Sequence, residues 1–157
     1  MNFYDQRFIV RRAETSDATE LLGLMHELAD FEKYREHFLV TETDLVRMGL
    51  GDGASDFVAY LCCTEEGKIE AYAVIVEIKF TFDLRPNWYL KEFFVRPEAR
   101  RQGVGAHLFE ALKAQARASG VGRLKWDVLP DTRSAQAFYR HHQGELETAW
   151  QAWILRF

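Results

Sequence analysis

The sequence lacks the features of several large protein classes. No apolar run in its 157 residues approaches the length needed to span a membrane. The formal net charge is only −4, and this mildly acidic balance argues against a nucleic-acid-binding protein, which usually presents a basic surface. The first seven residues are polar and contain no signal-peptide core. We therefore expect a cytoplasmic protein with neither a membrane nor a nucleic acid as partner.

Cysteine is also scarce. Cys62 and Cys63 are the only two, and they are adjacent in a predicted strand, where neighbouring side chains point to opposite faces. Such a pair is more typical of buried thiols than of a disulfide framework or a metal site. His141 and His142 are adjacent at a predicted helix end, and we expect them to be exposed there. No bound metal is expected.

Apolar and aromatic residues, in contrast, are plentiful. They make up 48% and 14% of the chain, which argues against disorder. A chain of this length normally forms one domain and can bury a core of its own. No repeat, linker or low-complexity segment divides it. We expect an N-terminal extension over residues 1–7 and a single domain over residues 8–157.

The spacing of apolar residues predicts alternating helices and strands. Helices are expected after the N-cap residues Thr15–Asp17 and from Thr41, whose spacing to Asp44 resembles a capping box. Further helices are expected from the glycine pair near residue 105 to about residue 119, and over residues 134–142. Strands are expected over residues 8–11, 57–63, 69–80, 88–95, 124–129 and 149–157, the second and third of them forming a hairpin. This order predicts an α/β (α+β) fold, a mixed central sheet with helices on both faces.

A glycine pair lies where the strand over residues 88–95 leads into a helix. The segment Arg100–Gly105 has the sequence Arg-Arg-Gln-Gly-Val-Gly. The first N–H groups of a helix have no intrahelical partner and form the positive end of its dipole. Glycines allow a ligand to approach them closely, and arginines add positive charge, so the segment suits a phosphate or pyrophosphate. A plain strand-to-helix turn explains the two glycines equally well.

Two familiar phosphate-binding loops do not match this segment. The dinucleotide fingerprint needs a third glycine where this chain has Leu108, and no Gly-Lys-Ser/Thr triplet of a P-loop exists in the chain. The remaining pattern, Arg-x-x-Gly-x-Gly, resembles the pyrophosphate loop of the GNAT superfamily of N-acetyltransferases. Members of that superfamily bind acetyl-coenzyme A (acetyl-CoA) at this loop.

The resemblance extends over roughly residues 8–157. It is greatest to the spermidine/spermine (diamine) and thialysine N-acetyltransferases. The shared segments are residues 28–32, 39–45, 80–83, 89–95 and 138–140, together with Trp150. The resemblance implies the GNAT acyl-CoA N-acyltransferase fold and acetyl-CoA as co-substrate.

The resemblance also implies how acetyl-CoA is held. The main chain of Phe93, Phe94 and Val95 would pair with the pantetheine arm. The pyrophosphate would be flanked by Arg100 and Arg101 and held by the backbone of Gln102, Gly103, Val104, Gly105 and Ala106. Thr132 stands where many members have an asparagine, and Thr132 or Ser134 would offer a hydroxyl to the pantetheine instead.

Two residues are candidates for the acetyl transfer itself. Tyr139 occupies the position of a tyrosine that protonates the coenzyme A thiolate in the family, although a Phe-Tyr pair on a short helix is also common in cores. Glu92 occupies an acidic position in an apolar strand, where a carboxylate is costly without a partner or a role. It could accept the proton of the amine through water. The alternative is an ion pair between Glu92 and a neighbouring Lys or Arg.

The acceptor is expected to be a primary amine of a small molecule. Glu32 and Asp83 match acidic positions around the amine in relatives, or are solvated loop charges, and Trp150 would wall the pocket or lie in the core. Lys91 replaces a carboxylate of the polyamine-type enzymes, although strand alternation points its side chain away from that of Glu92. Together with Arg85, Lys91 would favour an amine that also has a carboxylate, such as a lysine-like amino acid, over a polyamine.

The leading prediction is therefore an acetyl-CoA-dependent N-acetyltransferase. The amine would attack the thioester directly in a ternary complex, without an acyl-enzyme. The alternatives are a non-catalytic acyl-CoA-binding regulatory module and an enzyme that acetylates protein lysines or N-termini. Relatives are often dimers, and the aromatic C-terminal segment could pair between subunits, so we expect a homodimer.

Overall fold

The computed structural model describes residues 7–157, so the predicted N-terminal extension lies outside the described residues except for Arg7. The described residues divide into two compact units, one that ends at Asp127 and one over Val128–Phe157. That both belong to a single domain stays a prediction. Within the described part of the chain, no helix is both long enough and apolar enough to cross a membrane.

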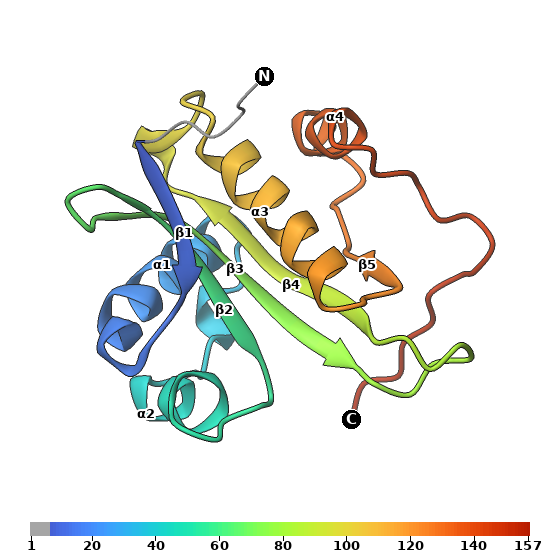
Figure 1. The fold of residues 1–157 in the computed structure, drawn as a ribbon, viewed down its shortest axis with the longest axis horizontal. Helices are drawn as coiled ribbons and strands as arrows, with labels where there is room; N and C mark the ends of the chain where they lie inside the picture. Colours follow the sequence, from blue (N-terminus) through green and yellow to red (C-terminus); the bar gives the residue numbers. More distant parts are fainter. Residues whose placement is uncertain (1–6) are drawn as a thin grey trace. The chain divides into compact units, whose positions relative to one another are not determined.

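The first unit is built on a five-stranded sheet (Figure 1). Its strands follow the sequence order β1 (Phe8–Arg12), β2 (Val58–Thr64), β3 (Ile69–Ile78), β4 (Asn87–Val95) and β5 (Arg123–Lys125). The first four are antiparallel to their neighbours, whereas β5 is parallel to β4. The predicted hairpin is confirmed as β2 and β3. The sheet is mixed, as predicted.

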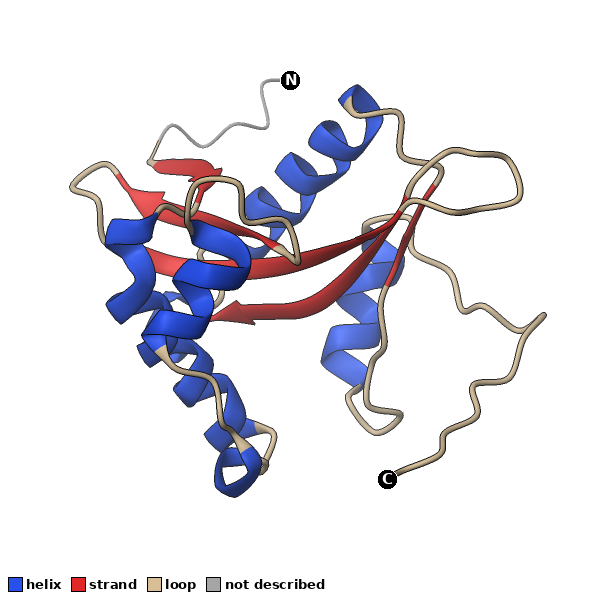
Figure 2. Cartoon of the chain, turned by 90° about the horizontal axis from the view of Figure 1, so that it is seen from below, coloured by secondary structure: helices blue, strands red, loops and turns tan. Residues whose placement is uncertain are grey.

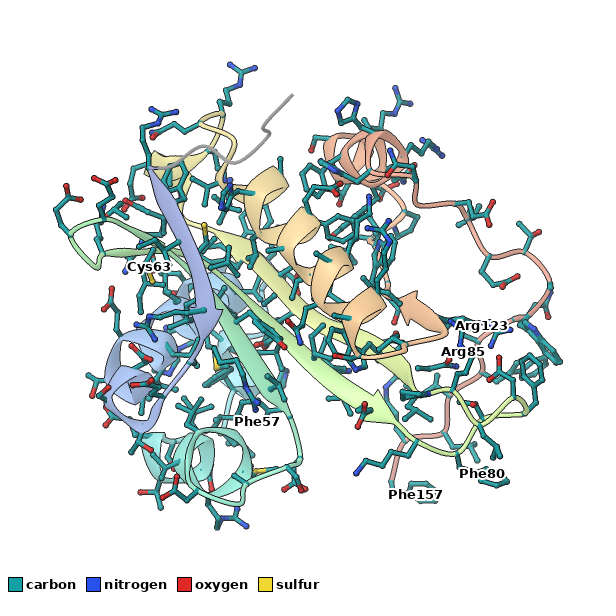
Figure 3. All side chains as sticks on the ribbon, viewed as in Figure 1. Phe57, Cys63, Phe80, Arg85, Arg123 and Phe157 are labelled. Atoms are coloured by element: carbon teal, nitrogen blue, oxygen red, sulfur yellow. The ribbon has the colours of Figure 1, made fainter. Side chains whose placement is uncertain are left out.

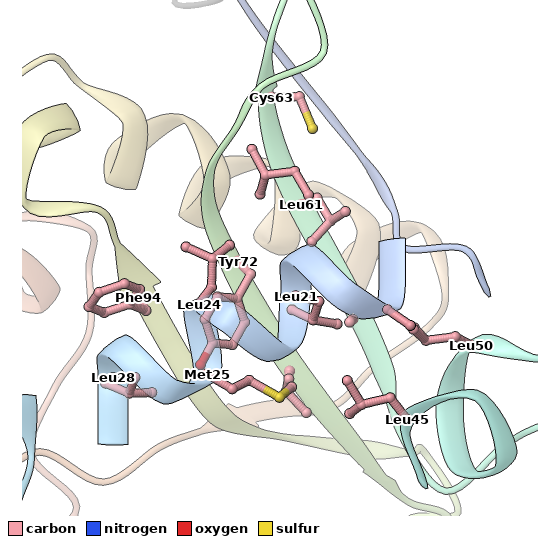
Figure 4. Close-up of a cluster of buried hydrophobic side chains, with 14 residues drawn as sticks. Leu21, Leu24, Met25, Leu28, Leu45, Leu50, Leu61, Cys63, Tyr72 and Phe94 are labelled. Atoms are coloured by element: carbon pink, nitrogen blue, oxygen red, sulfur yellow. The ribbon is translucent and has the colours of Figure 1, made fainter. Parts of the chain in front are cut away.

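Helices cover both faces of this sheet (Figure 2). They are α1 (Ala18–Phe31), α2 (Glu42–Leu45) and α3 (Val104–Ala118), with short turns η1 (Thr15–Asp17), η2 (Arg35–His37), the π-helical η3 (Val46–Leu50) and η4 (Pro97–Ala99). Leu21, Leu24 and Leu28 of α1 pack on one face in a cluster with Tyr72 and Phe94 (Figure 4). On the other face, Phe109 of α3 stacks edge-on against Phe93 of β4. Phe93 thus faces α3, whereas Phe94 faces α1.

The N-cap interactions predicted for α1 and α2 are found only at α2. The capping box at α2 is confirmed, because the Thr41 hydroxyl accepts from the backbone N–H of Asp44 at 3.2 Å and the Thr41 backbone N–H donates to the Asp44 carboxylate at 3.0 Å. At α1, Asp17 occupies the N-cap position but makes no side-chain cap bond to that helix. Its carboxylate accepts instead from both terminal nitrogens of Arg11, each at 2.8 Å, and from the backbone N–H of Glu14.

The second unit contains α4 (Arg133–His141), which confirms the predicted helix. The strand predicted over residues 149–157 is wrong, because that segment has no regular secondary structure and is exposed throughout. A strand needs a neighbour for its backbone N–H and C=O groups, and the described residues of this unit form no other strand. The strand predicted over residues 124–129 is real but shorter, since β5 ends at Lys125.

Candidate active site

The glycine loop has the backbone geometry of an open helix start. Gly103 is the N-cap of α3 with φ of 81°, a left-handed conformation that favours glycine, and a Cβ there would meet nothing within 4 Å. The first intrahelical bond of α3 runs from the His107 N–H to the Gly103 carbonyl at 2.9 Å. The N–H groups of residues 103–106 therefore precede the hydrogen-bonded turns and are available to an anion.

The two arginines before the glycines have different surroundings. Arg100 donates from Nε to the Val95 carbonyl at 3.2 Å, and its guanidinium lies 5.3 Å from the Phe31 ring centroid and 5.9 Å from that of Phe94. It therefore connects the loop to the end of β4. Arg101 is exposed and has φ of 64°. Gln102 is exposed as well, with its side-chain amide bonded to the Glu98 carbonyl.

The strand before this loop has an edge that is only partly covered. β5 pairs with β4 over Asn87–Tyr89 alone. Beyond Tyr89, no strand among residues 7–157 pairs with the second edge of β4. The segment that contains Phe93, Phe94 and Val95 thus lies on an open edge directly before the glycine loop, where an extended ligand arm can bond to the main chain.

A β-bulge shapes the same segment. Val74 of β3 pairs with Glu92, but the next residue, Ile75, pairs with Leu90, so Lys91 is an extra residue in β4. The bulge breaks the strict alternation on which the opposite faces of Lys91 and Glu92 were predicted. Regular alternation therefore does not decide the direction of the Lys91 side chain, which stays a prediction. The Lys91 ammonium lies 5.4 Å from the ring centroid of Tyr89 and is close enough to Glu92 to lower the pKa of its carboxyl.

Glu92 is half-buried on the face of the sheet that packs against α1. Val74, which pairs with Glu92, and Phe94, two residues after Glu92 on the same strand, both belong to the core cluster with α1. Burial raises the pKa of Glu92, and the carboxylate of Glu32 raises it further, whereas Tyr72 and Lys91 lower it without cancelling the rise. Glu92 makes no salt bridge among residues 7–157, so the structure does not give it the ion pair considered as an alternative.

Two tyrosines and a second carboxylate surround Glu92. Glu32 is the C-cap of α1, and burial raises its pKa. Burial, followed by the carboxylates of Glu92 and Glu32, raises the pKa of Tyr34 to about 12. Burial and then Glu92 also raise the pKa of Tyr72, which lies on β3. The predicted residues Glu32 and Glu92 are thus brought together, in a setting that disfavours a second negative charge.

Sequence reasoning missed Tyr34 and Tyr72. A signal for Tyr72 was present, because a hydroxyl between Ala71 and Ala73 in a strand expected to be buried needs a hydrogen-bond partner. No comparable signal marked Tyr34. Its placement depends on how the chain turns after α1.

The loop between β3 and β4 contains the other basic and acidic candidates. The Asp83 carboxylate accepts hydrogen bonds from the Thr81 hydroxyl at 3.0 Å and from the Arg85 backbone N–H at 3.2 Å. Both donors belong to the same loop as Asp83. The Arg85 guanidinium donates to the Val121 carbonyl at 3.2 Å. Arg85 and Arg123 lie at the same end of the sheet (Figure 3), and Arg123 stacks 4.7 Å from the Phe82 ring centroid. The structure does not group Asp83 with Glu92.

Four predicted residues lie in the second unit. Tyr139 is half-buried on α4, with its ring edge-on to that of Phe138 at 5.3 Å. Thr132 is the N-cap of α4 but makes no side-chain cap bond, so its hydroxyl is not committed to the helix, and Ser134 is exposed in the first turn. Trp150 is 79% exposed and is therefore not a core residue.

This chain is similar to several known acetyltransferases. A family model described as acetyltransferase (GNAT) family matches residues 16–144. The thialysine N-epsilon-acetyltransferase of Caenorhabditis elegans is 27% identical over 122 residues, covering 78% of this chain and 73% of that protein. The protein of the same name from Bos taurus is 25% identical over 154 residues, covering 92% and 88%.

A solved structure agrees in fold. An aminoglycoside acetyltransferase from an uncultured soil metagenomic sample, in complex with sisomicin, has a TM-score of 0.79 at 16% identity, covering 97% of this chain and 99% of that one. At this identity the likeness shows the fold alone. The family match, in contrast, spans most of the sequence and confirms the resemblance that the glycine loop predicted. The chain belongs to the acetyltransferase (GNAT) family and is an acetyl-transferring enzyme.

Proposed function

We propose that this protein transfers the acetyl group of acetyl-CoA to a primary amine of a small molecule. The observation that supports this most directly is the position of Glu92, a half-buried carboxylate of raised pKa on β4, three residues before the open strand end at Val95. A carboxylate whose pKa is raised is a stronger base than an ordinary glutamate, and a protonated amine must lose a proton before it attacks.

The proposed site for acetyl-CoA consists of the strand edge and the helix start. The GNAT family uses acetyl-CoA as co-substrate. The main chain of Phe93–Val95 would bind the pantetheine arm, and the backbone N–H groups of residues 103–106 would bind the pyrophosphate, with Arg101 exposed beside it. Arg100 would contribute by fixing the loop to Val95. Thr132 or Ser134 would bond to the pantetheine, as the family resemblance implies.

In the proposed reaction, Glu92 takes a proton from the ammonium through water, and the neutral amine attacks the thioester carbonyl carbon. The new C–N bond forms and the C–S bond breaks. The thiolate of coenzyme A receives a proton from Tyr139, and the proton that the attacking nitrogen must still lose passes through water to the Tyr139 phenolate, which restores the phenol. The proton on Glu92 returns to solvent, and no acyl-enzyme forms. General acid and base groups placed in this way typically contribute about 10²- to 10⁴-fold each to a rate.

For the acceptor, we propose an amine that also has a carboxylate, such as a lysine-like amino acid. Lys91 is a positive group beside Glu92 and would repel a polyamine while attracting a carboxylate. Arg85, whose guanidinium bonds to the Val121 carbonyl, would add positive charge from the loop before β4. Glu32 would attract the ammonium. Trp150 would add an aromatic wall, as the family resemblance implies. Asp83, whose carboxylate bonds within its own loop, would contribute negative charge only from a distance. The names of the two animal relatives refer to thialysine, which supports the same class.

We also propose that the enzyme works as a cytoplasmic homodimer. Support comes from the C-terminal segment, where Trp150, Trp153, Leu155 and Phe157 are all at least 79% exposed. Side chains of this size are usually covered in the working assembly.

The experiment that tests the function is the release of coenzyme A thiol from acetyl-CoA across a panel of amines. The panel would contain lysine, thialysine, ornithine, spermidine, spermine, an aminoglycoside and a histone-tail peptide, with Tyr139→Phe and Glu92→Gln beside the wild type. We expect release with the amino acids, reduced about 10²-fold or more in both variants. Release with spermidine alone would overturn the acceptor class. Binding of acetyl-CoA without release on any amine would overturn the function and favour a regulatory acyl-CoA-binding module.

A further inference from the structure

Tyr72 has a hydroxyl that its place in the core does not require. Its side chain is 0% exposed and is the bulkiest of the fully buried ones. The hydroxyl is buried and has no standard hydrogen bond among the described residues. A phenylalanine would fill the same space without an unpaired polar atom, which is costly in a core. The hydroxyl is therefore expected to serve the residues around it.

The sheet places Tyr72 diagonally next to Glu92. Tyr72 pairs with Phe94, and Val74 pairs with Glu92, so Tyr72 and Glu92 lie on one face in neighbouring register positions. Diagonal neighbours on adjacent strands are within reach of aromatic side chains. Figure 4 shows the Tyr72 ring beside Leu24 and Met25, with its hydroxyl directed toward the part of α1 that contains Leu28.

The chain turns sharply just beyond this point. Lys33 has φ of 62°, and the Tyr34 N–H bonds back to the Ala29 carbonyl at 2.9 Å. This turn brings Glu32 and Tyr34 to the carboxylate of Glu92. The charged and titratable groups that act on Glu92 are thus Glu32 from α1, Tyr34 from the turn, Tyr72 from β3 and Lys91 from β4.

We propose that Tyr72 is a positioning residue, whose hydroxyl donates to the Glu92 carboxylate, holds it toward the acceptor amine and favours its ionised form against the charge of Glu32. This inference rests on the proposed function, in which Glu92 receives the amine proton. Burial and the nearby carboxylate keep the Tyr72 phenol protonated, so it remains a donor at any pH at which the enzyme works. The regular pairing of Tyr72 with Phe94 and of Val74 with Glu92 places Glu92 on the Tyr72 face of the sheet.

The proposal is tested by measuring the titration of Glu92 itself. The carboxyl ¹³C signal of Glu92, assigned by its loss in Glu92→Gln, would be followed against pH in the wild type, in Tyr72→Phe and in Tyr60→Phe. Tyr60 is the matched control, because it pairs with Ala73 and faces the other side of the sheet, with its ring 6.5 Å from Trp88. We expect the Glu92 pKa to rise by about one unit in Tyr72→Phe and to stay unchanged in Tyr60→Phe. An unchanged Glu92 pKa in Tyr72→Phe would overturn the proposal.

A kinetic measurement separates this proposal from the proposed function. In Tyr72→Phe, the acid limb of kcat/KM for the amine should move to higher pH, with about tenfold loss on that limb and recovery at higher pH. A loss that is equal at all pH values would mean that Tyr72 only packs. If the Glu92 pKa rises in the variant but no amine is acetylated by the wild type, the contact stands and the proposed function fails.

Discussion

At the scale of single residues, the surroundings of Asp17 and of Glu92 shift the pKa of their carboxyl groups in opposite directions. Asp17 accepts two bonds from Arg11 and one from a backbone N–H, and these donors lower its pKa. Glu92 is half-buried near a second carboxylate, and its pKa is raised. The first environment stabilises the ionised side chain in the fold. The second destabilises the ionised side chain, and side chains with a pKa shifted in this way are common in active sites.

Replacing Glu92 by glutamine should therefore stabilise the fold while removing activity. The folded protein holds the Glu92 proton more tightly than the unfolded chain, so ionisation opposes folding once the pH exceeds the unfolded pKa near 4.5. We expect Glu92→Gln to melt about 3 °C higher than the wild type at pH 7. The gain should disappear below about pH 4, where both proteins are neutral at this position. A lower melting temperature at pH 7 would contradict the account of Glu92.

Asp17 should show the opposite behaviour. Because Arg11 and the Glu14 N–H lower its folded pKa, its contribution is present above the unfolded pKa near 3.8 and is lost as the pH falls through the lower folded value. We expect Asp17→Asn to cost about 1–3 kcal/mol at pH 7, measured by urea unfolding, because it leaves Arg11 without its carboxylate. The difference from the wild type should shrink toward pH 2, and a constant difference across pH would refute the assignment.

At the scale of elements, local patterns predicted most of the fold. The strands β1 to β4 and the helices α1, α3 and α4 were found within about three residues, because their apolar periodicity and end signals are local. The bulge at Lys91 could not be predicted, since a register shift is a property of two paired strands and leaves no mark in either sequence. The grouping of Glu32 with Glu92 was expected only from the family, whereas Tyr34 and Tyr72 depend on the three-dimensional packing.

The glycine loop gives a prediction at this scale. Gly103 at the start of α3 and Gly120 just after its end both have positive φ, 81° and 70°, and neither would have a Cβ contact within 4 Å. Gly103→Ala and Gly120→Ala should each cost about 1 kcal/mol of stability from backbone strain. Only Gly103→Ala should weaken acetyl-CoA binding, by about tenfold in calorimetry, because only its backbone belongs to the proposed pyrophosphate site. Equal affinities of the two variants for acetyl-CoA would show that the glycine loop does not bind the pyrophosphate.

At the scale of the whole molecule, the C-terminal segment over residues 149–157 is where the predicted strand is absent. The aromatic-rich segment from Ala149 to Phe157 was predicted to be a strand, but a strand forms only where another strand can pair with it. The same segment, with Trp153 at 89% exposed, is the surface that we propose to lie between subunits.

The oligomeric state tests this proposal. We expect the wild type to sediment as a dimer and Trp153→Lys to sediment as a monomer at micromolar concentration, because a buried lysine in an apolar contact is costly. The matched control is Gln151→Lys, a neighbouring exposed position. A monomeric wild type, or a Trp153→Lys variant that remains a dimer, would contradict the assignment of this segment to an interface.

The central claim is that an amine is acetylated next to Glu92. The most direct measurement is mass spectrometry of the products formed from ¹³C-acetyl-CoA and lysine at pH 8, with wild type and Glu92→Gln compared. We predict labelled N-acetyl-lysine with the wild type and at least about 100-fold less with the variant. Equal product from both proteins would show that Glu92 is not the base. Coenzyme A binding without any labelled amine across the panel would contradict the account as a whole.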